Sequence, residues 1–419
     1  MKKSLHTSLL ALCLALCCGA PARAQTGAGR PYDEQARALL ASPEVRAAFA
    51  HVERHRDAIL KEWIAITEVN APSGKEGARA DLIERLLQSY KSLEVRRDGA
   101  GNVVATRRGT GGGPRVVIDA HMDTVFQDGL KIKAEVRDGR VYAPGVGDDT
   151  RNVEAMLATA RALDAAGVKT KGDLVFLFTV EEETSFRGVE EFVKENKGRI
   201  DHYIALDGGY EGFTYGGIGI NWYKHHFIGP GGHTRSQTPP YSATLPAARA
   251  IERIYRLQLP RDVPANLNIG MLGGADVVNA KAADAWFTVD LRSTSNEVIA
   301  DLEKKIAAIV KEEAERERMT VRTELLSSTP AAQIPGHRDS RLVKTAEAVH
   351  YAMGFRPPIT VTGSNNGNVA LLAGISAIST GAGPCRDAHA LTENCEIEPL
   401  YKGIQKVLAL GVAMAQLSR

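Results

Sequence analysis

The residues in this sequence that could carry chemistry are histidines and carboxylates that follow short apolar runs or glycine-rich turns. His121 and Asp123 follow the apolar run 116–119. Residues two apart in an extended chain point to the same side, so His121 can bind a metal ion while Asp123 orients its ring. The other candidates of this kind are Asp148, Asp149, Glu181, Glu182, Glu183, Asp207 and His389.

Taken singly, each of these residues is typical of a helix cap, a turn or a solvated loop. Taken together, they stand where the strands of one sheet are predicted to end, and an α/β sheet gathers its site at that edge. The adjacent glutamates 181–183 repel one another unless cations compensate them. Two histidines with several carboxylates suit zinc, and a shared carboxylate holds two ions about 3.5–4 Å apart. The pattern predicts a two-metal hydrolytic site.

Alternating elements are expected to position these side chains. The runs 116–119 and 174–180 are short, apolar and rich in branched and aromatic residues, as buried strands are. Residues 152–166 between them have helical spacing, and Ser73 with Glu76 reads as a capping box that opens another helix. This alternation predicts an α/β fold with a mostly parallel central sheet flanked by helices.

A second pattern begins near residue 219. A strand-like run, 221–228, is followed by a glycine-rich turn, a helical segment, a strand near 285–291 and a second helical segment, which together predict an inserted α+β block. We therefore expect one α/β domain formed by residues 25–218 and 327–419, with the inserted domain at 219–326. A chain of 419 residues is longer than one core usually supports, so two domains are also expected from length.

The first residues have the form of a secretory signal peptide. Lys2 and Lys3 precede the apolar run 9–18, and small residues stand before Gln25, so residues 1–24 are predicted to be removed and the protein exported to a periplasm or secreted. No later run is apolar enough for a membrane span. Of the five cysteines, this leaves Cys385 and Cys395, which form either one disulfide or two buried thiols.

Composition excludes one class of partner. The formal net charge is only +2, and no basic run is interleaved with aromatic residues. Nucleic-acid binding is therefore not expected.

The order of these motifs resembles a known family, the co-catalytic zinc exopeptidases that include peptidase T, carboxypeptidase G and the aminoacylases. The segments that carry the resemblance are 119–124, 147–149, 181–183, 207–209, 231–233 and 387–389. The resemblance implies that His121, Asp148 and Asp207 bind one zinc ion, and that Asp148, Glu183 and His389 bind the other. It also implies that Glu182 is the general base and that Asp123 orients His121.

The resemblance extends to the inserted block, which in such enzymes is a lid and dimerisation domain. His233 matches a histidine that reaches the site of the neighbouring subunit and stabilises the developing oxyanion. Arg292 matches an arginine that clamps a substrate carboxylate, and Asn279 is a further substrate-contact candidate. A homodimer through residues 219–326 is thus implied.

The sequence leaves several interpretations of the function open. Asp207-Gly208-Gly209 resembles the peptidase T branch, which implies aminopeptidase or dipeptidase action on short peptides, and deacylation of N-acyl amino acids would use the same zinc chemistry. A metal-dependent binding protein would not require Glu182 as a base. Departures from the family pattern at 150–152 and 364–367 are expected to alter the pocket wall, and cobalt or manganese could replace zinc.

Overall fold

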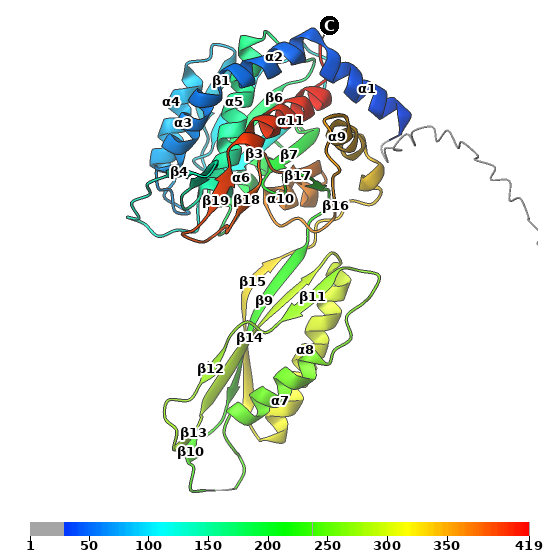
Figure 1. Cartoon of the computed structure of the whole chain (residues 1–419). Coiled ribbons are helices and arrows are strands. Elements are labelled where there is room, and N and C mark those ends of the chain that lie inside the picture. The colour runs from blue at the N-terminus through cyan, green and yellow to red at the C-terminus, as the bar shows by residue number, and fades with distance from the viewer. Residues whose placement is uncertain (1–28, 237, 419) are drawn as a thin grey trace, which may run out of the picture.

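The computed structural model describes residues 29–236 and 238–418. The predicted signal peptide, residues 1–24, lies outside these residues. The described part forms an α/β domain and a separate α+β lobe that is joined to it through two long strands (Figure 1). Both expected architectures are present, and the fold prediction is confirmed.

An eight-stranded sheet is the centre of the larger domain, in the order β1-β2-β6-β3-β7-β17-β8-β16. The four central strands, β6, β3, β7 and β17, run parallel. The strands span Leu93–Arg97 (β1), Val103–Arg107 (β2), Leu174–Thr179 (β6), Val116–His121 (β3), His202–Leu206 (β7), Ser376–Thr380 (β17), Phe213–Thr214 (β8) and Ile359–Thr360 (β16). Their parallel direction brings the carboxyl ends of β3, β6 and β7 to one edge.

Helices cover both faces of this sheet because its central strands are apolar on both sides. Ile118 belongs to the core under α5 and α11, whereas its neighbour Val117 belongs to the core under α6 and α10. The helices are α1 (Arg30–Ala41), α2 (Pro43–Arg54), α3 (Arg56–Thr67), α4 (Gly77–Gln88), α5 (Arg151–Ala165), α6 (Arg187–Glu195), α9 (Arg341–Ala352), α10 (Asn366–Leu372) and α11 (Glu398–Ala415). A sheet buried on both faces is what continuous apolar strands predict.

The predicted capping box at the start of α4 is wrong. The helix begins only at Gly77, and its N-cap residue Glu76 makes no side-chain capping bond. The Glu76 carboxylate instead accepts hydrogen bonds from the backbone N–H groups of Gly74 and Glu181. Ser73 donates its hydroxyl to Asp123. Both residues serve tertiary contacts at the edge of the sheet, which a local motif could not reveal.

A small four-stranded sheet, in the order β18-β19-β5-β4, lies beside the main one. It pairs β5 (Arg140–Tyr142) with β19 (Asn394–Glu396), and β19 in turn with β18 (Cys385–Arg386), while β4 (Glu135–Arg137) forms its other edge. This sheet therefore joins the chain just before Asp148 to the loop that carries His389.

The second lobe, here called the lid, is built on β9 (Gly219–Ile228), β14 (Asp284–Ser293) and β15 (Thr320–Thr329). β11 (Ala265–Asn268) and β12 (Leu272–Gly274) pair with β14. Helices α7 (Thr244–Tyr255) and α8 (Asn296–Arg316) pack on one face of this sheet, over a core that contains Phe227 and Phe287. A short pair, β10 (Gly232–His233) with β13 (Ala280–Lys281), lies at the end of the lid away from the larger domain (Figure 1).

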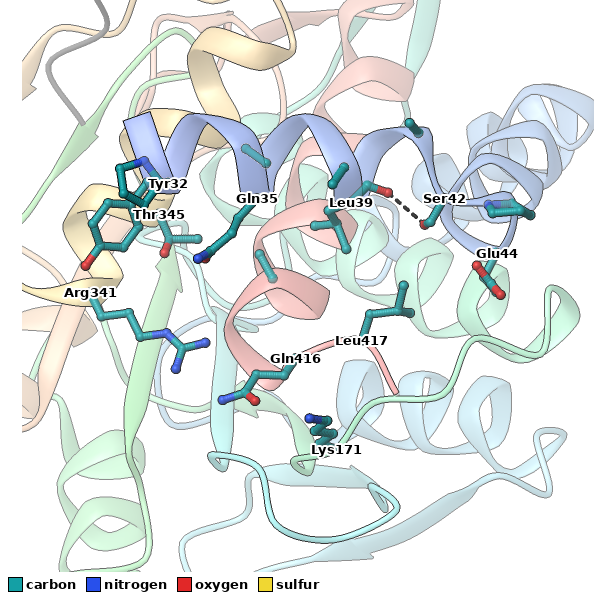
Figure 2. A pocket seen from close by; sticks show the side chains of 16 residues that line it. Tyr32, Gln35, Leu39, Ser42, Glu44, Lys171, Arg341, Thr345, Gln416 and Leu417 are labelled. Carbon is teal, nitrogen blue, oxygen red and sulfur yellow. Dashed lines mark hydrogen bonds between the residues drawn. The ribbon is translucent and has the colours of Figure 1, made fainter. Parts of the chain in front are cut away.

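A cavity of about 1050 Å³ lies beneath α1, bordered also by α9 and the end of α11 (Figure 2). Tyr32, Leu39, Arg341 and Leu417 are among its lining residues. Lys171, which also lines it, lies just before the start of β6, whereas the candidate glutamates follow the end of β6. None of the candidate site residues borders this cavity.

No helix within residues 29–236 and 238–418 has the length and apolar character needed to cross a membrane.

Close packing of α11 against the turn after β17 provides a test of the fold. A Cβ atom on Gly403 would lie 1.6 Å from the carbonyl oxygen of Ala382, whereas a Cβ atom on Gly77 at the start of α4 would meet nothing within 4 Å. We expect Gly403→Ala to lower the free energy of unfolding by about 1–3 kcal/mol, because the helix must move away from the backbone.

The matched variant Gly77→Ala should leave stability unchanged or raise it by up to about 1 kcal/mol, because alanine favours helix. Urea unfolding followed by circular dichroism compares the two variants. Equal stability for both would show that α11 does not pack this closely.

Candidate metal centre

The ends of two neighbouring strands supply most of the site. β3 ends at His121, and the glutamates 181–183 follow β6, which pairs with β3 in parallel. Ligand atoms of His121, Glu182 and Glu183 all lie within 4.8 Å of one another. The predicted convergence at this edge of the sheet is therefore present.

Asp148 lies between the two histidines. It belongs to the buried turn Val146–Thr150 (η1) that leads into α5. Its Oδ1 is 3.0 Å from Nε2 of His121, and its Oδ2 is 3.1 Å from Nε2 of His389. Nε2 of His389 is also 3.1 Å from Oε1 of Glu183. The two oxygens of one carboxylate thus face two different histidines, which is the arrangement a bridging ligand needs.

Asp123 contacts both His121 and the turn that carries Glu182 and Glu183. Its carboxylate accepts the backbone N–H groups of Glu182 and Glu183, at 3.0 and 3.1 Å. The Nδ1 atom of His121 is 3.1 Å from the Asp123 carbonyl and 3.3 Å from its carboxylate. Burial would raise the pKa of Asp123, but the hydrogen bond from His121 holds it below the usual range. Asp123 therefore fixes the His121 ring with Nε2 directed at Asp148.

Glu182 differs from its neighbours because no hydrogen bond to its carboxylate is present among the described residues, although it is only 8% exposed. Burial raises the pKa of Glu182 well above its usual range, and the nearby Asp207 and Glu183 add to the shift. By contrast, Glu181 points to Arg187, whose Nε lies 2.8 Å away. An unpaired buried carboxyl beside the cluster is free to exchange a proton with a ligand.

Asp207 follows β7 and is half-buried. Ligand atoms of His121, Asp148 and Asp149 lie within 4.8 Å of one another, and the carboxylate of Asp207 is not part of this group. However, both oxygens of Asp149 accept hydrogen bonds, one from the backbone N–H of His121 and one from Asn152. These bonds give Asp149 a positioning role. Burial and the nearby Asp148 raise the pKa of Asp207 to about 6.

The residues present fit a pair of divalent cations. Burial raises the pKa of Glu183 to about 7, and Glu182 and Asp207 shift in the same direction. Such shifts mark carboxyl groups that the protein itself does not neutralise. Arg151, a nearby cation, donates its hydrogen bonds to the carbonyls of Gly208 and Gly383, to Asn152 and to the sulfur of Cys385. Imidazole nitrogen and carboxylate oxygen form the donor set expected for zinc and similar ions.

The segments 150–152 and 364–367, which depart from the family pattern, also position residues of the site. Arg151 borders a cavity of about 680 Å³, as expected for a pocket wall. The Asn152 side chain donates a hydrogen bond to Asp149 and accepts one from the backbone N–H of Ala382. Asn365 donates to the carbonyl of Asp207, and Asn366 to the buried Asp119. The sequence prediction for these segments was therefore incomplete, because Ala382 and Asp207 lie in loops distant along the chain and Asp119 lies on β3.

The candidate site residues of the lid lie apart from the groups that surround Asp148. His233 and Asn279 are exposed on the β10–β13 end of the lid, where Thr234 donates to the carbonyl of Asn279 (Figure 1). Arg292 lies on β14 and forms an ion pair with Asp290, at 3.1 Å. Within the described chain these residues do not join the groups that surround Asp148.

Comparison with known proteins places this geometry in a family. Residues 117–411 match the model of peptidase family M20/M25/M40. The chain belongs to this family. The resemblance seen in the sequence is thereby confirmed, and the chain is a hydrolase of a peptidase family.

Several known proteins are similar to this chain. Carboxypeptidase G2 of Pseudomonas sp. (strain RS-16) is 25% identical over 273 residues, which span 62% of this chain and 65% of that protein. A tripeptidase from Staphylococcus aureus superposes with a TM-score of 0.77 at 23% identity, covering 86% of this chain and 99% of that one. YXEP of Bacillus subtilis, described as a dinuclear metal binding peptidase from the M20 family, gives 0.67 at 15% identity, covering 87% and 100%. At such identities the structures show the shared fold.

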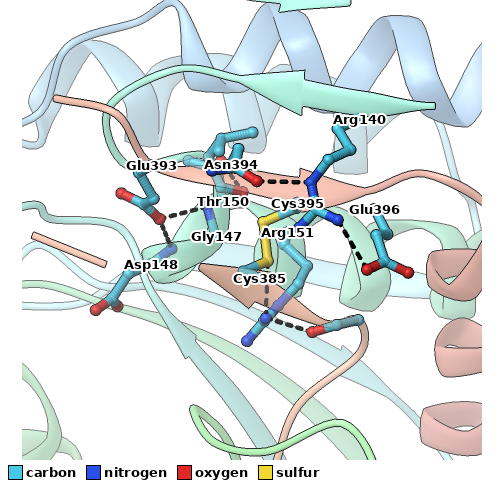
Figure 3. Close-up of a disulfide and its surroundings, with 12 residues drawn as sticks. Arg140, Gly147, Asp148, Thr150, Arg151, Cys385, Glu393, Asn394, Cys395 and Glu396 are labelled. Atoms are coloured by element: carbon cyan, nitrogen blue, oxygen red, sulfur yellow. Dashed lines mark hydrogen bonds and ion pairs between the residues drawn. A yellow bond between two sulfur atoms is a disulfide. The ribbon is translucent and has the colours of Figure 1, made fainter. Parts of the chain in front are cut away.

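A disulfide between Cys385 and Cys395 decides between the two alternatives left open for these cysteines (Figure 3). It closes the loop that carries His389. It also packs on the turn of Asp148, because a Cβ atom on Gly147 would lie 2.8 Å from the sulfur of either cysteine. The cross-link thus lies against both the loop of one ligand and the turn of another.

We expect the double variant Cys385→Ser, Cys395→Ser to lose about 2–4 kcal/mol of stability and to bind metal more weakly, because the ligand loop is no longer restrained. Thermal unfolding and metal titration measure the two effects. Thiol titration of the denatured, unreduced protein without residues 1–24 should detect no free thiol. Two free thiols would contradict the cross-link.

Proposed function

We propose that this chain is a two-zinc exopeptidase that hydrolyses a terminal amide bond of short peptides, as an aminopeptidase, dipeptidase or tripeptidase does. The observation that carries the proposal is the Asp148 carboxylate between His121 and His389, with the unpaired Glu182 beside it. The similar structures described as a tripeptidase and as aminopeptidase PepT from Bacillus cereus support the peptide class. Zinc is inferred from the donor set, and cobalt or manganese would suit the same ligands.

Each side chain of the site has a separate role in the proposed hydrolysis. Zinc, when bound, lowers the pKa of a coordinated water and polarises the substrate carbonyl. Glu182 accepts the proton of the attacking water and returns it to the leaving amine. Asp123 keeps His121 in its orientation by the contacts described above. No covalent bond between enzyme and substrate is needed.

Export is part of the proposal. The sequence of residues 1–24 supports removal of a signal peptide, and a disulfide persists in an oxidising compartment such as a periplasm.

We also propose that the protein forms a homodimer through the lid, because the lid sheet has an exposed edge strand. β15 is the edge strand, next to β9, and its Leu325 and Leu326 are 56% and 47% exposed. An exposed edge strand with apolar side chains is suited to association with a second copy.

His233 has the chemistry to act in such a dimer. The backbone N–H of Arg235 donates to its Nδ1 at 3.0 Å, so the neutral ring carries its proton on the exposed Nε2. That N–H can stabilise negative charge on a carbonyl oxygen. Arg292 and Asn279 remain proposed substrate contacts, and binding of a substrate carboxylate by Arg292 would compete with its ion pair to Asp290.

The test of the function is a panel of substrates. Purified mature protein with zinc is incubated with dipeptides, tripeptides and their N-acetylated forms, and products are identified by mass. We expect release of terminal residues from free peptides and loss of activity on chelation. Cleavage of the N-acetylated forms alone would instead support an N-acyl amino acid deacylase, and metal binding without any turnover would indicate a binding protein.

Glu182→Gln should reduce kcat by about 10²–10⁴-fold because the base is removed, while about two metal ions per chain remain. Elemental analysis and steady-state kinetics give the two values. Glu181→Gln is the matched control: this side chain pairs with Arg187, so its kcat should stay near that of the wild type. Loss of both metals from Glu182→Gln would show that this residue is a ligand.

Complementation tests the sharing of sites. His233→Ala and Glu182→Gln should each be nearly inactive as homodimers. After subunit exchange, one site of each heterodimer draws intact Glu182 and His233 from different chains, so activity should rise to about half of wild type per heterodimer. Exchange demonstrated by mass spectrometry without recovery would exclude action of His233 across the dimer.

A further inference from the structure

Glu393 is a buried carboxylate that binds the turn of Asp148. It is 0% exposed and lies in the disulfide-closed loop, four positions after His389. Its Oε1 accepts the backbone N–H groups of both Gly147 and Asp148, each at 2.7 Å (Figure 3). Its Oε2 accepts the backbone N–H of Gly145, also at 2.7 Å. Both carboxylate oxygens are therefore used within one turn.

The turn depends on this carboxylate because the three N–H groups have no other acceptor among the described residues. Successive backbone N–H groups that point inward form a concave anion site. Here a side chain occupies that site. The backbone of Glu393 adds a further bond, since its carbonyl accepts the N–H of Ala143 at 3.1 Å.

One loop consequently holds Asp148 at two points. Glu393 binds its backbone N–H, and His389 contacts its carboxylate. The disulfide fixes the ends of the loop and packs against Gly147. Rotation of the Asp148 backbone would move both carboxylate oxygens away from the two histidines at once.

We propose that Glu393 is a positioning residue for Asp148: it fixes the 145–148 turn so that the two oxygens of Asp148 face His121 and His389, as a ligand shared by two metal ions would require. This inference rests on the proposed two-metal function. Glu393 itself touches neither of the histidines that flank Asp148 in the contacts described above.

The test is titration of the metal-free protein with Co²⁺, followed by visible absorption. Glu393→Gln keeps the shape of the side chain but replaces one acceptor oxygen with a donor, so at least one N–H of the turn loses its partner. We expect Co²⁺ affinity to fall about 10–100-fold at one site or both, with a changed absorption spectrum. Glu393→Asp keeps both acceptor oxygens and should recover part of the affinity and spectrum, and it serves as the second variant if Glu393→Gln does not fold.

Asp98→Asn is the matched control. Asp98 also accepts three backbone N–H groups, from Ala100, Gly101 and Asn102, in a turn that contributes no proposed ligand. It should lose stability without a change in Co²⁺ spectrum or affinity. If Glu393→Gln behaves like this control, the inference is overturned and Glu393 is structural only. If the wild type itself binds fewer than two Co²⁺ ions, the proposed function fails, and the inference with it.

Discussion

The mutual repulsion of buried carboxylates is the constraint on which the rest of this structure depends. Parallel strands bring the glutamates after β6 and the aspartate after β7 to one edge, and the turn before α5 adds Asp148. The protein offers them two histidines, while Arg151 donates its hydrogen bonds to backbone carbonyls, to Asn152 and to the sulfur of Cys385. Like charges in a medium of low dielectric constant are costly without cations. The fold is thus arranged for divalent ions.

A second principle is that buried carboxylates outside the ligand set stabilise the loops. Asp123, Glu76 and Glu393 each accept backbone N–H groups from turns that carry candidate ligands or their neighbours. Hydrogen bonds to ionised groups are stronger than those between neutral groups. Irregular segments that would otherwise be mobile are in this way held at the geometry that a metal pair requires.

In the proposed dimer, the lid would contribute His233 to a site that its own domain does not contain. His233 is exposed at one end of the lid, with the proton of its neutral ring on the exposed nitrogen. The cluster around Asp148 lies at the sheet edge of the other domain, which the long strands β9 and β15 connect to the lid (Figure 1). An exposed edge strand and an exposed histidine on one lobe are consistent with a site completed by a second chain.

The α/β fold, the inserted lobe and the residues around Asp148 could be predicted from the sequence, because a strand, its polar end and a metal-ligand type are local features. The role of Ser73 and Glu76 could not be predicted, because they resemble a helix cap yet bind Asp123 and the backbone N–H of Glu181. The sequence also did not reveal the role of Glu393, or distinguish a disulfide from two thiols. These features became clear only in the folded protein, because each depends on a hydrogen bond or a sulfur contact between segments that come together on folding. Such a contact leaves no periodicity or spacing in either segment.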